Sequence, residues 1–117
     1  MTVKRGDVVL VDYPFTTGGA KVRPALVVQN DRDNARMSNT VVAQISGNTT
    51  RVHEATQFLI ELTAEPGCGL ARDSALIATN LLTMNQDDVL CVIGSLSTAA
   101  MERIDDCLRV ALDLNQP

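Results

Sequence analysis

Short apolar runs separated by turn-forming residues restrict the fold of this 117-residue chain more than any other feature. Such runs, rich in β-branched residues and bounded by Gly, Pro, Asn and Asp, are typical of β-strands in a small β-rich domain. We expect strands at Val8–Val11, Pro24–Gln29, Thr40–Ile45, Phe58–Leu62, Ser74–Ala78 and Val89–Leu96. Between them we expect a loop over Phe15–Val22, a polar turn over Asn30–Asn34 and irregular chain over Thr79–Asp88. At this length, residues 1–117 are predicted to form one domain.

The end of the chain has a different periodicity. Apolar residues recur there at the spacing of one helix face, and charged residues occupy the other face. The apolar positions are Met101, Ile104, Leu108, Ala111 and Leu112. Ser97 or Thr98 precedes them and can accept a hydrogen bond from an unpaired amide of the first turn. The pattern predicts an amphipathic helix of about 15 residues that packs against the β-strands.

Composition excludes several classes of protein. With 45% apolar and 21% charged residues, the chain does not resemble a disordered segment. It has no apolar run long enough to cross a membrane. Gly6 and Asp7 interrupt any apolar core of a secretion signal at the start, so we expect a cytoplasmic protein.

Cysteine and histidine are too sparse for a metal centre or a His-dependent hydrolase. The sequence holds Cys68, Cys91, Cys107 and one histidine, His53, with no CxxC pair. We therefore expect no metal and no cofactor, and we interpret Cys91 and Cys107 as small buried thiols. The sequence also lacks a nucleophile-elbow serine motif and a P-loop.

Charge is unevenly distributed along the chain. The net charge is −4, but residues 1–51 carry seven basic and four acidic side chains, a net +3. Residues 52–117 carry three basic and ten acidic side chains, a net −7. The whole chain is too acidic for general binding of nucleic acid, whereas a local basic face in the first half can bind a polyanion.

Polar and basic residues gather beside two neighbouring predicted strands. Lys21 and Arg23 stand at the start of the second strand, and the segment Ser46–Arg51 follows the third. If these strands pair as a meander, the two groups lie either close together or at opposite ends. The spacing alone leaves both arrangements open.

Several motifs resemble the MazF/PemK toxin family, and together they cover nearly the whole chain. The segments are Lys4–Asp12, a Gly18-Gly19 loop leading into Arg23–Asp31, the triplet Arg72–Ser74, and Leu96–Asp105. The resemblance implies a mostly β fold with α-helix, an SH3-like, partly open β-barrel (PemK/CcdB-like) closed by a C-terminal amphipathic helix. It also implies a homodimer.

The same resemblance implies an activity. Members of the family are metal-independent, sequence-selective endoribonucleases that cleave single-stranded RNA. The ribose 2′-OH attacks the adjacent phosphate and leaves 2′,3′-cyclic phosphate and 5′-OH ends. A cognate antitoxin neutralises the enzyme, and we expect its acidic, flexible tail to occupy the basic face in place of RNA.

The resemblance also implies the site residues. Arg23 matches the family's catalytic arginine in the R-P-A-L motif, and Ser46 falls where the family usually has a threonine hydroxyl. The candidate RNA-binding residues are Thr17, Lys21, Asn48, Thr49, Arg51 and Asn80. Asp12 or His53 are candidates for assisting proton transfer, and Phe15 and Tyr13 for stacking on bases.

Two other readings share the expected fold. One is a non-enzymatic inhibitor like the CcdB gyrase poisons, which lack the arginine and hydroxyl pair. The other is a degenerate member that only binds RNA or an antitoxin, an option that the Ser46 substitution leaves open. Arg23 together with Ser46 favours the ribonuclease.

Overall fold

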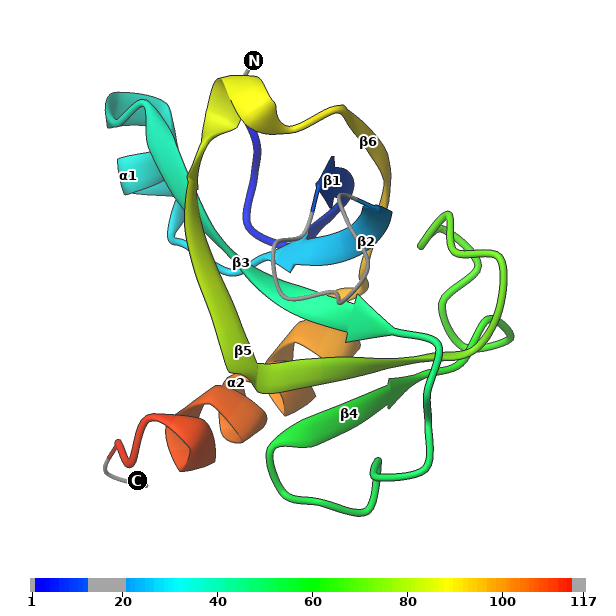
Figure 1. The fold of residues 1–117 in the computed structure, drawn as a ribbon. Coiled ribbons are helices and arrows are strands. Elements are labelled where there is room, and N and C mark those ends of the chain that lie inside the picture. The colour runs from blue at the N-terminus through cyan, green and yellow to red at the C-terminus, as the bar shows by residue number, and fades with distance from the viewer. Residues whose placement is uncertain (1, 13–20, 115–117) are drawn as a thin grey trace.

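Six antiparallel strands form a strongly curled sheet in the computed structural model, which describes residues 2–12 and 21–114 (Figure 1). The strands are β1 (Asp7–Asp12), β2 (Val22–Val27), β3 (Asn39–Ser46), β4 (Gln57–Ile60), β5 (Ser74–Asn85) and β6 (Cys91–Ser95). Their order across the sheet is β4-β5-β3-β2-β1-β6. Two helices, α1 (Asp31–Arg36) and α2 (Thr98–Ala111), and a short 3₁₀ turn, η1 (Gln86–Asp88), complete the fold. The predicted partly open barrel is confirmed.

Both faces of the sheet are covered, which explains why the strands read as continuous apolar runs. Because side chains alternate along a strand, Val8 and Leu26 face one buried cluster while their neighbours Val9 and Val27 face another. The first cluster includes Ile104 of α2, and the second includes Val3 from the N-terminal segment. A strand buried on both sides needs no alternation of apolar and polar residues.

Helix α2 closes one side of the sheet, where it contacts β4 and β5 (Figure 1). Ser97 is its N-cap, as one of the two predicted alternatives had it, and its Oγ accepts a hydrogen bond from the Ala100 amide at 3.1 Å. Met101 and Ile104 are buried as predicted. The prediction for Leu112 was wrong, because this residue follows the helix and is 53% exposed. No helix within the described ranges is long and apolar enough to cross a membrane.

Two segments differ from the expected secondary structure. Helix α1 replaces the predicted polar turn, because Asn30 caps it by accepting a hydrogen bond from the Asp33 amide at 2.9 Å. Strand β5 continues to Asn85, and η1 follows, where irregular chain was predicted. Pairing with β3 supplies the hydrogen bonds that hold this second half of β5 extended.

The three cysteines have different environments. Cys68 and Cys107 are buried, whereas Cys91 is exposed on the edge strand β6, so the prediction that it is buried was wrong. Desolvation by burial, followed by the nearby Asp106 carboxylate, raises the pKa of the Cys107 thiol above its usual value. A raised thiol pKa stabilises the fold below the ordinary cysteine pKa, and this contribution is lost as the pH rises through the folded-state value.

We expect a thiol reagent at neutral pH to modify Cys91 within minutes and Cys107 only after unfolding. The reaction requires a thiolate that the reagent can reach. Cys107 is buried, and its raised pKa reduces the fraction of thiolate. Mass spectrometry of the native and urea-unfolded protein measures the number of labels. A Cys91→Ser variant that still gains a label in the native state at the wild-type rate contradicts this assignment.

Candidate active site

The pairing of β2 with β3 brings the two polar groups of the sequence to one end of the sheet. Ala25 lies opposite Gln44 in this antiparallel pair. Arg23 precedes Ala25 by two residues and Ser46 follows Gln44 by two, so both lie at the same end of this antiparallel pair. Alternation puts the side chains of Arg23, Gln44 and Ser46 on one face. Of the two arrangements that the sequence left open, the structure therefore has the close one.

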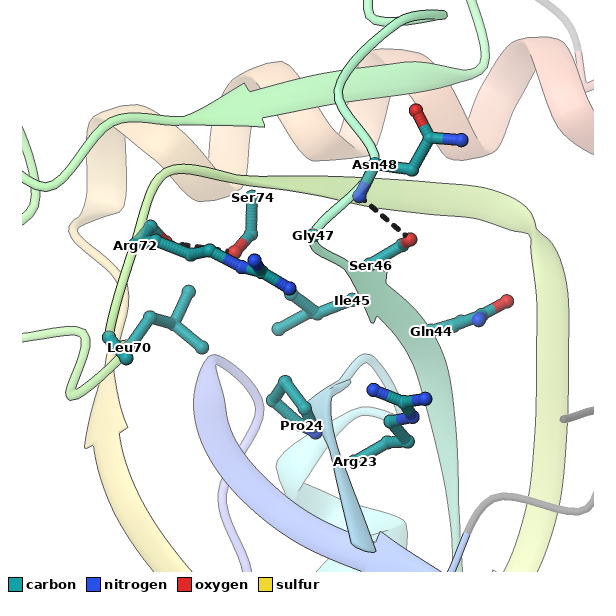
Figure 2. Close-up of a pocket in the computed structure, with 11 residues that line it drawn as sticks. Arg23, Pro24, Gln44, Ile45, Ser46, Gly47, Asn48, Leu70, Arg72 and Ser74 are labelled. Atoms are coloured by element: carbon teal, nitrogen blue, oxygen red, sulfur yellow. Dashed lines mark hydrogen bonds between the residues drawn. The ribbon is translucent and has the colours of Figure 1, made fainter. Parts of the chain in front are cut away.

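Arg23 and Ser46 line one open cavity of about 350 Å³ (Figure 2). Its lining contains both apolar and polar residues. The apolar ones are Pro24, Ile45, Leu70 and Ala71, and the others are Arg23, Gln44, Ser46, Gly47, Asn48, Arg72 and Ser74. Arg23 and Ser46 are both half-buried, so their polar groups are held by the sheet while they remain accessible.

The Ser46 hydroxyl is oriented by the turn that follows it. The Asn48 amide donates a hydrogen bond to Ser46 Oγ at 3.1 Å (Figure 2). Because this contact uses an acceptor site of the oxygen, the hydroxyl hydrogen is left to donate to a ligand. Asn48 Oδ1 in turn accepts from the Thr50 amide at 3.1 Å and from Thr50 Oγ1 at 2.8 Å. These bonds fix the turn and hold Asn48 at the cavity edge.

A second depression, of about 310 Å³, adjoins the first and shares Ser46 and Asn48 with it. Its other lining residues are Arg51, Gln57, Ile77, Thr79 and Asn80. It arises from a bulge: Ala43 pairs with Leu81 but the next residue, Gln44, pairs with Ile77. The register between β3 and β5 therefore skips Ala78, Thr79 and Asn80, and Thr79 and Asn80 line the depression. Bulges commonly redirect side chains in this way beside binding sites. Asn80 Nδ2 donates to Gln44 Oε1 at 2.6 Å and joins the two walls.

The combined cavity is electropositive although the whole chain is acidic. Arg23, Arg51 and Arg72 line it, and its described lining contains no carboxylate and no histidine. The ion pairs found within residues 2–12 and 21–114 do not involve these three arginines. Clustered guanidinium groups with an adjacent hydroxyl form a site for a phosphate-bearing ligand. In the described part of the chain, no three His, Cys, Asp or Glu side chains gather as a candidate metal site.

The structure brings together five of the predicted site residues and leaves out two. Those brought together are Arg23, Ser46, Asn48, Arg51 and Asn80. Lys21 is exposed and Thr49 is half-buried, and neither lines the two depressions. Thr17, Tyr13 and Phe15 lie outside the described residues.

The two candidates for proton transfer do not line the cavity. Asp12 lies at the end of β1, opposite Val22. His53 is 74% exposed beside Glu54 and borders a different depression, next to α2.

Sequence reasoning missed several lining residues, of which Arg72 carries charge. Gln44, Ser74, Gln57 and Thr79 are the polar ones. The triplet Arg72–Ser74 was visible as a family-like motif, but its distance in sequence from Arg23 and Ser46 gave no sign that it reaches the same cavity. Strand β5 makes this connection by pairing Ala75 with Ser46.

The fold is a partly open β-barrel, and the cavity at the end of β2 and β3 presents three arginines and a hydroxyl, which are groups that suit an anionic ligand. The sequence model of the PemK-like, MazF-like toxins of type II toxin–antitoxin systems matches residues 4–112. The chain belongs to this family.

Individual relatives agree with this assignment. The chain is 31% identical to endoribonuclease EndoA of Bacillus subtilis over 116 residues, covering 97% of each protein. It is also 31% identical to endoribonuclease MazF6 of Mycobacterium tuberculosis, covering 97% of this chain and all of that protein. Among solved structures, an endoribonuclease from a mycobacterial species superposes with a TM-score of 0.80 at 24% identity, covering 100% of this chain and 97% of the other, which supports the fold.

Proposed function

We propose that the protein is a metal-independent, sequence-selective endoribonuclease that cleaves single-stranded RNA in the cytoplasm. Residues 1–117 act as one domain. The observation that carries the proposal is that Arg23 and Ser46, 23 residues apart in sequence, line one accessible cavity without a carboxylate in its described lining. The names of the curated relatives, endoribonucleases EndoA and MazF6, support the same activity.

The chemistry follows from the groups in the cavity. The ribose 2′-oxygen loses its proton and forms a bond to phosphorus, the bond from phosphorus to the 5′-oxygen breaks, and the 5′-oxygen gains a proton. Negative charge builds on the non-bridging oxygens during this exchange. Arg23 presents paired donors to them and Ser46 Oγ a further donor, and each preorganised donor of this kind contributes about 3 kcal/mol. Arg23 acts electrostatically, through the permanent positive charge of its guanidinium group, and not as a base.

The protein partners proposed for this chain are a cognate antitoxin and a second copy of itself as a homodimer. Support for the antitoxin comes from a solved structure of similar fold, an endoribonuclease from a mycobacterial species in complex with its cognate antitoxin. Its TM-score is 0.77 at 24% identity, and the superposition covers 98% of this chain and 99% of the other. The electropositive cavity suits the acidic tail expected of such a partner, which would compete with RNA for it.

The activity is tested by incubating the purified protein with long single-stranded RNA in EDTA. The proposal expects discrete fragments that carry 2′,3′-cyclic phosphate and 5′-OH ends. Intact RNA at high protein excess supports instead a non-enzymatic inhibitor or a degenerate binding module on the same fold. Cleavage that requires a divalent cation contradicts the metal-independent mechanism.

Ser46→Ala is expected to slow cleavage by about a hundredfold, because it removes one hydrogen-bond donor to the developing charge. Ser46→Thr keeps the hydroxyl and restricts its rotamers, so we expect it to retain or exceed the wild-type rate. Single-turnover cleavage of one RNA measures both rates. Equal losses in Ala and Thr variants that remain folded contradict a role for the hydroxyl.

A further inference from the structure

The guanidinium group of Arg72 lies directly against the backbone of Gly47 (Figure 2). A Cβ atom at position 47 would lie 2.6 Å from Arg72 Cζ and 2.7 Å from its Nε, a distance that real Cβ atoms essentially never show. The missing side chain of Gly47 therefore creates the space that this guanidinium fills. Gly47 directly follows Ser46, so Arg72 packs on the same turn that carries the hydroxyl of the proposed reaction, and both residues line one cavity.

The residues around Arg72 hold its backbone and leave its charge available. Buried Ser74 donates a hydrogen bond from Oγ to the Arg72 carbonyl at 2.9 Å. The neighbouring carboxylate of Asp73 accepts from the Leu62 amide at 2.9 Å and is thereby directed to the start of another loop. Within the described chain, Arg72 takes part in no ion pair, and its side chain is exposed.

Arg72 and Arg23 approach the cavity from different elements. Arg23 comes from β2, and Arg72 comes from the segment that leads into β5. Figure 2 shows Ile45 between the two guanidinium groups, so they face different parts of the cavity. A single strand of RNA carries a phosphate at every nucleotide. Two separated cations in one open groove therefore match two phosphates of one strand better than they match a single phosphate.

We propose that Arg72 binds a backbone phosphate next to the one held by Arg23, and that Gly47 is a positioning residue that keeps the Arg72 guanidinium at this place. The proposal rests on the ribonuclease function proposed above. It adds a second phosphate contact and a physical reason for glycine at position 47.

The test measures RNA binding separately from cleavage. A single-stranded RNA with 2′-O-methyl riboses cannot undergo 2′-OH attack, so its dissociation constant is measured over a series of KCl concentrations. The logarithm of the association constant falls as the logarithm of the salt concentration rises, and each lost phosphate contact reduces the magnitude of this slope by about 0.7 for single strands. Arg72→Ala is expected to lower the slope by about this amount and to raise the dissociation constant about tenfold at moderate salt. The control Arg103→Ala removes an exposed cation on α2, outside the cavity, and is expected to leave both values unchanged.

Gly47→Ala tests the positioning role through a double-mutant cycle. The colliding atoms belong to the far end of a flexible side chain, so the variant is expected to fold and to displace Arg72. It should weaken binding and lower the salt slope in the wild-type background, and do neither in the Arg72→Ala background, because coupled residues are not additive. Circular dichroism verifies that all variants are folded.

The outcomes separate this inference from the proposed function. A wild-type salt slope with Arg72→Ala, in a protein that binds and cleaves RNA, overturns the phosphate contact and leaves the ribonuclease standing. Equal effects of Gly47→Ala in both backgrounds overturn the positioning role. A wild-type protein that neither binds nor cleaves RNA removes the proposed function itself.

Discussion

Arg23→Ala is expected to reduce the rate of RNA cleavage by about a thousandfold. Arg23 lies on β2 and lines the same cavity as Ser46 of β3, and it supplies a pair of donors where negative charge builds during attack. Arg23→Lys keeps the charge but loses the planar pair, so we expect it to fall between alanine and wild type. Single-turnover cleavage of one labelled RNA in EDTA measures all three rates.

Two controls test whether a loss of activity is specific to Arg23. Arg36→Ala removes an exposed cation of α1 that contacts Asp33, and it is expected to cleave at the wild-type rate. Thermal unfolding establishes that the Arg23 variants remain folded, as expected for a half-buried side chain at the end of a strand. A folded Arg23→Ala protein that cleaves within threefold of wild type contradicts the assignment of the site.

Most strands were predictable because strand formation here depends on local composition. Residues such as Val8, Val9, Val41 and Val42 are β-branched and apolar, and such residues favour strands. Because both faces of the sheet are covered, polar residues do not interrupt these runs. The second half of β5 was not predictable in this way. Its bulge at Ala78–Asn80 breaks the alternation, and pairing with β3 compensates for it.

The site was predictable in part. The resemblance to the toxin family pointed to positions 23 and 46, but the proximity of these residues depends on the pairing of β2 with β3, which is a property of the folded sheet. Arg72 was missed because its route into the cavity passes through a long-range strand pair and through space left by Gly47. Neither is a local feature of the sequence.

Gly94→Ala is expected to destabilise the protein by about 3 kcal/mol and to lower its melting temperature by about 10 °C. Gly94 pairs with Val8 in the sheet, and the turn before β5 packs directly on it. A Cβ at position 94 would lie 2.6 Å from the Cys68 carbonyl oxygen. This atom belongs to the backbone and cannot rotate away, unlike the side-chain end that Gly47→Ala would meet. The Ser95 amide also bonds the Gly67 carbonyl at 3.0 Å, so retreat of the turn would break that contact.

Gly67→Ala is the matched control, because it lies in the same turn but its added Cβ would meet only the Ser95 carbonyl oxygen, at 3.9 Å. We expect its free energy of unfolding to stay within about 0.5 kcal/mol of wild type. Urea unfolding followed by circular dichroism measures both variants. Because Gly94, Gly67 and Cys68 do not line the Arg23 cavity, the fraction of Gly94→Ala protein that is folded should cleave RNA at the wild-type rate. Equal stability of the two variants would show that the turn can move away from β6 without loss of stability. Close packing of the turn backbone would then not explain why position 94 is glycine.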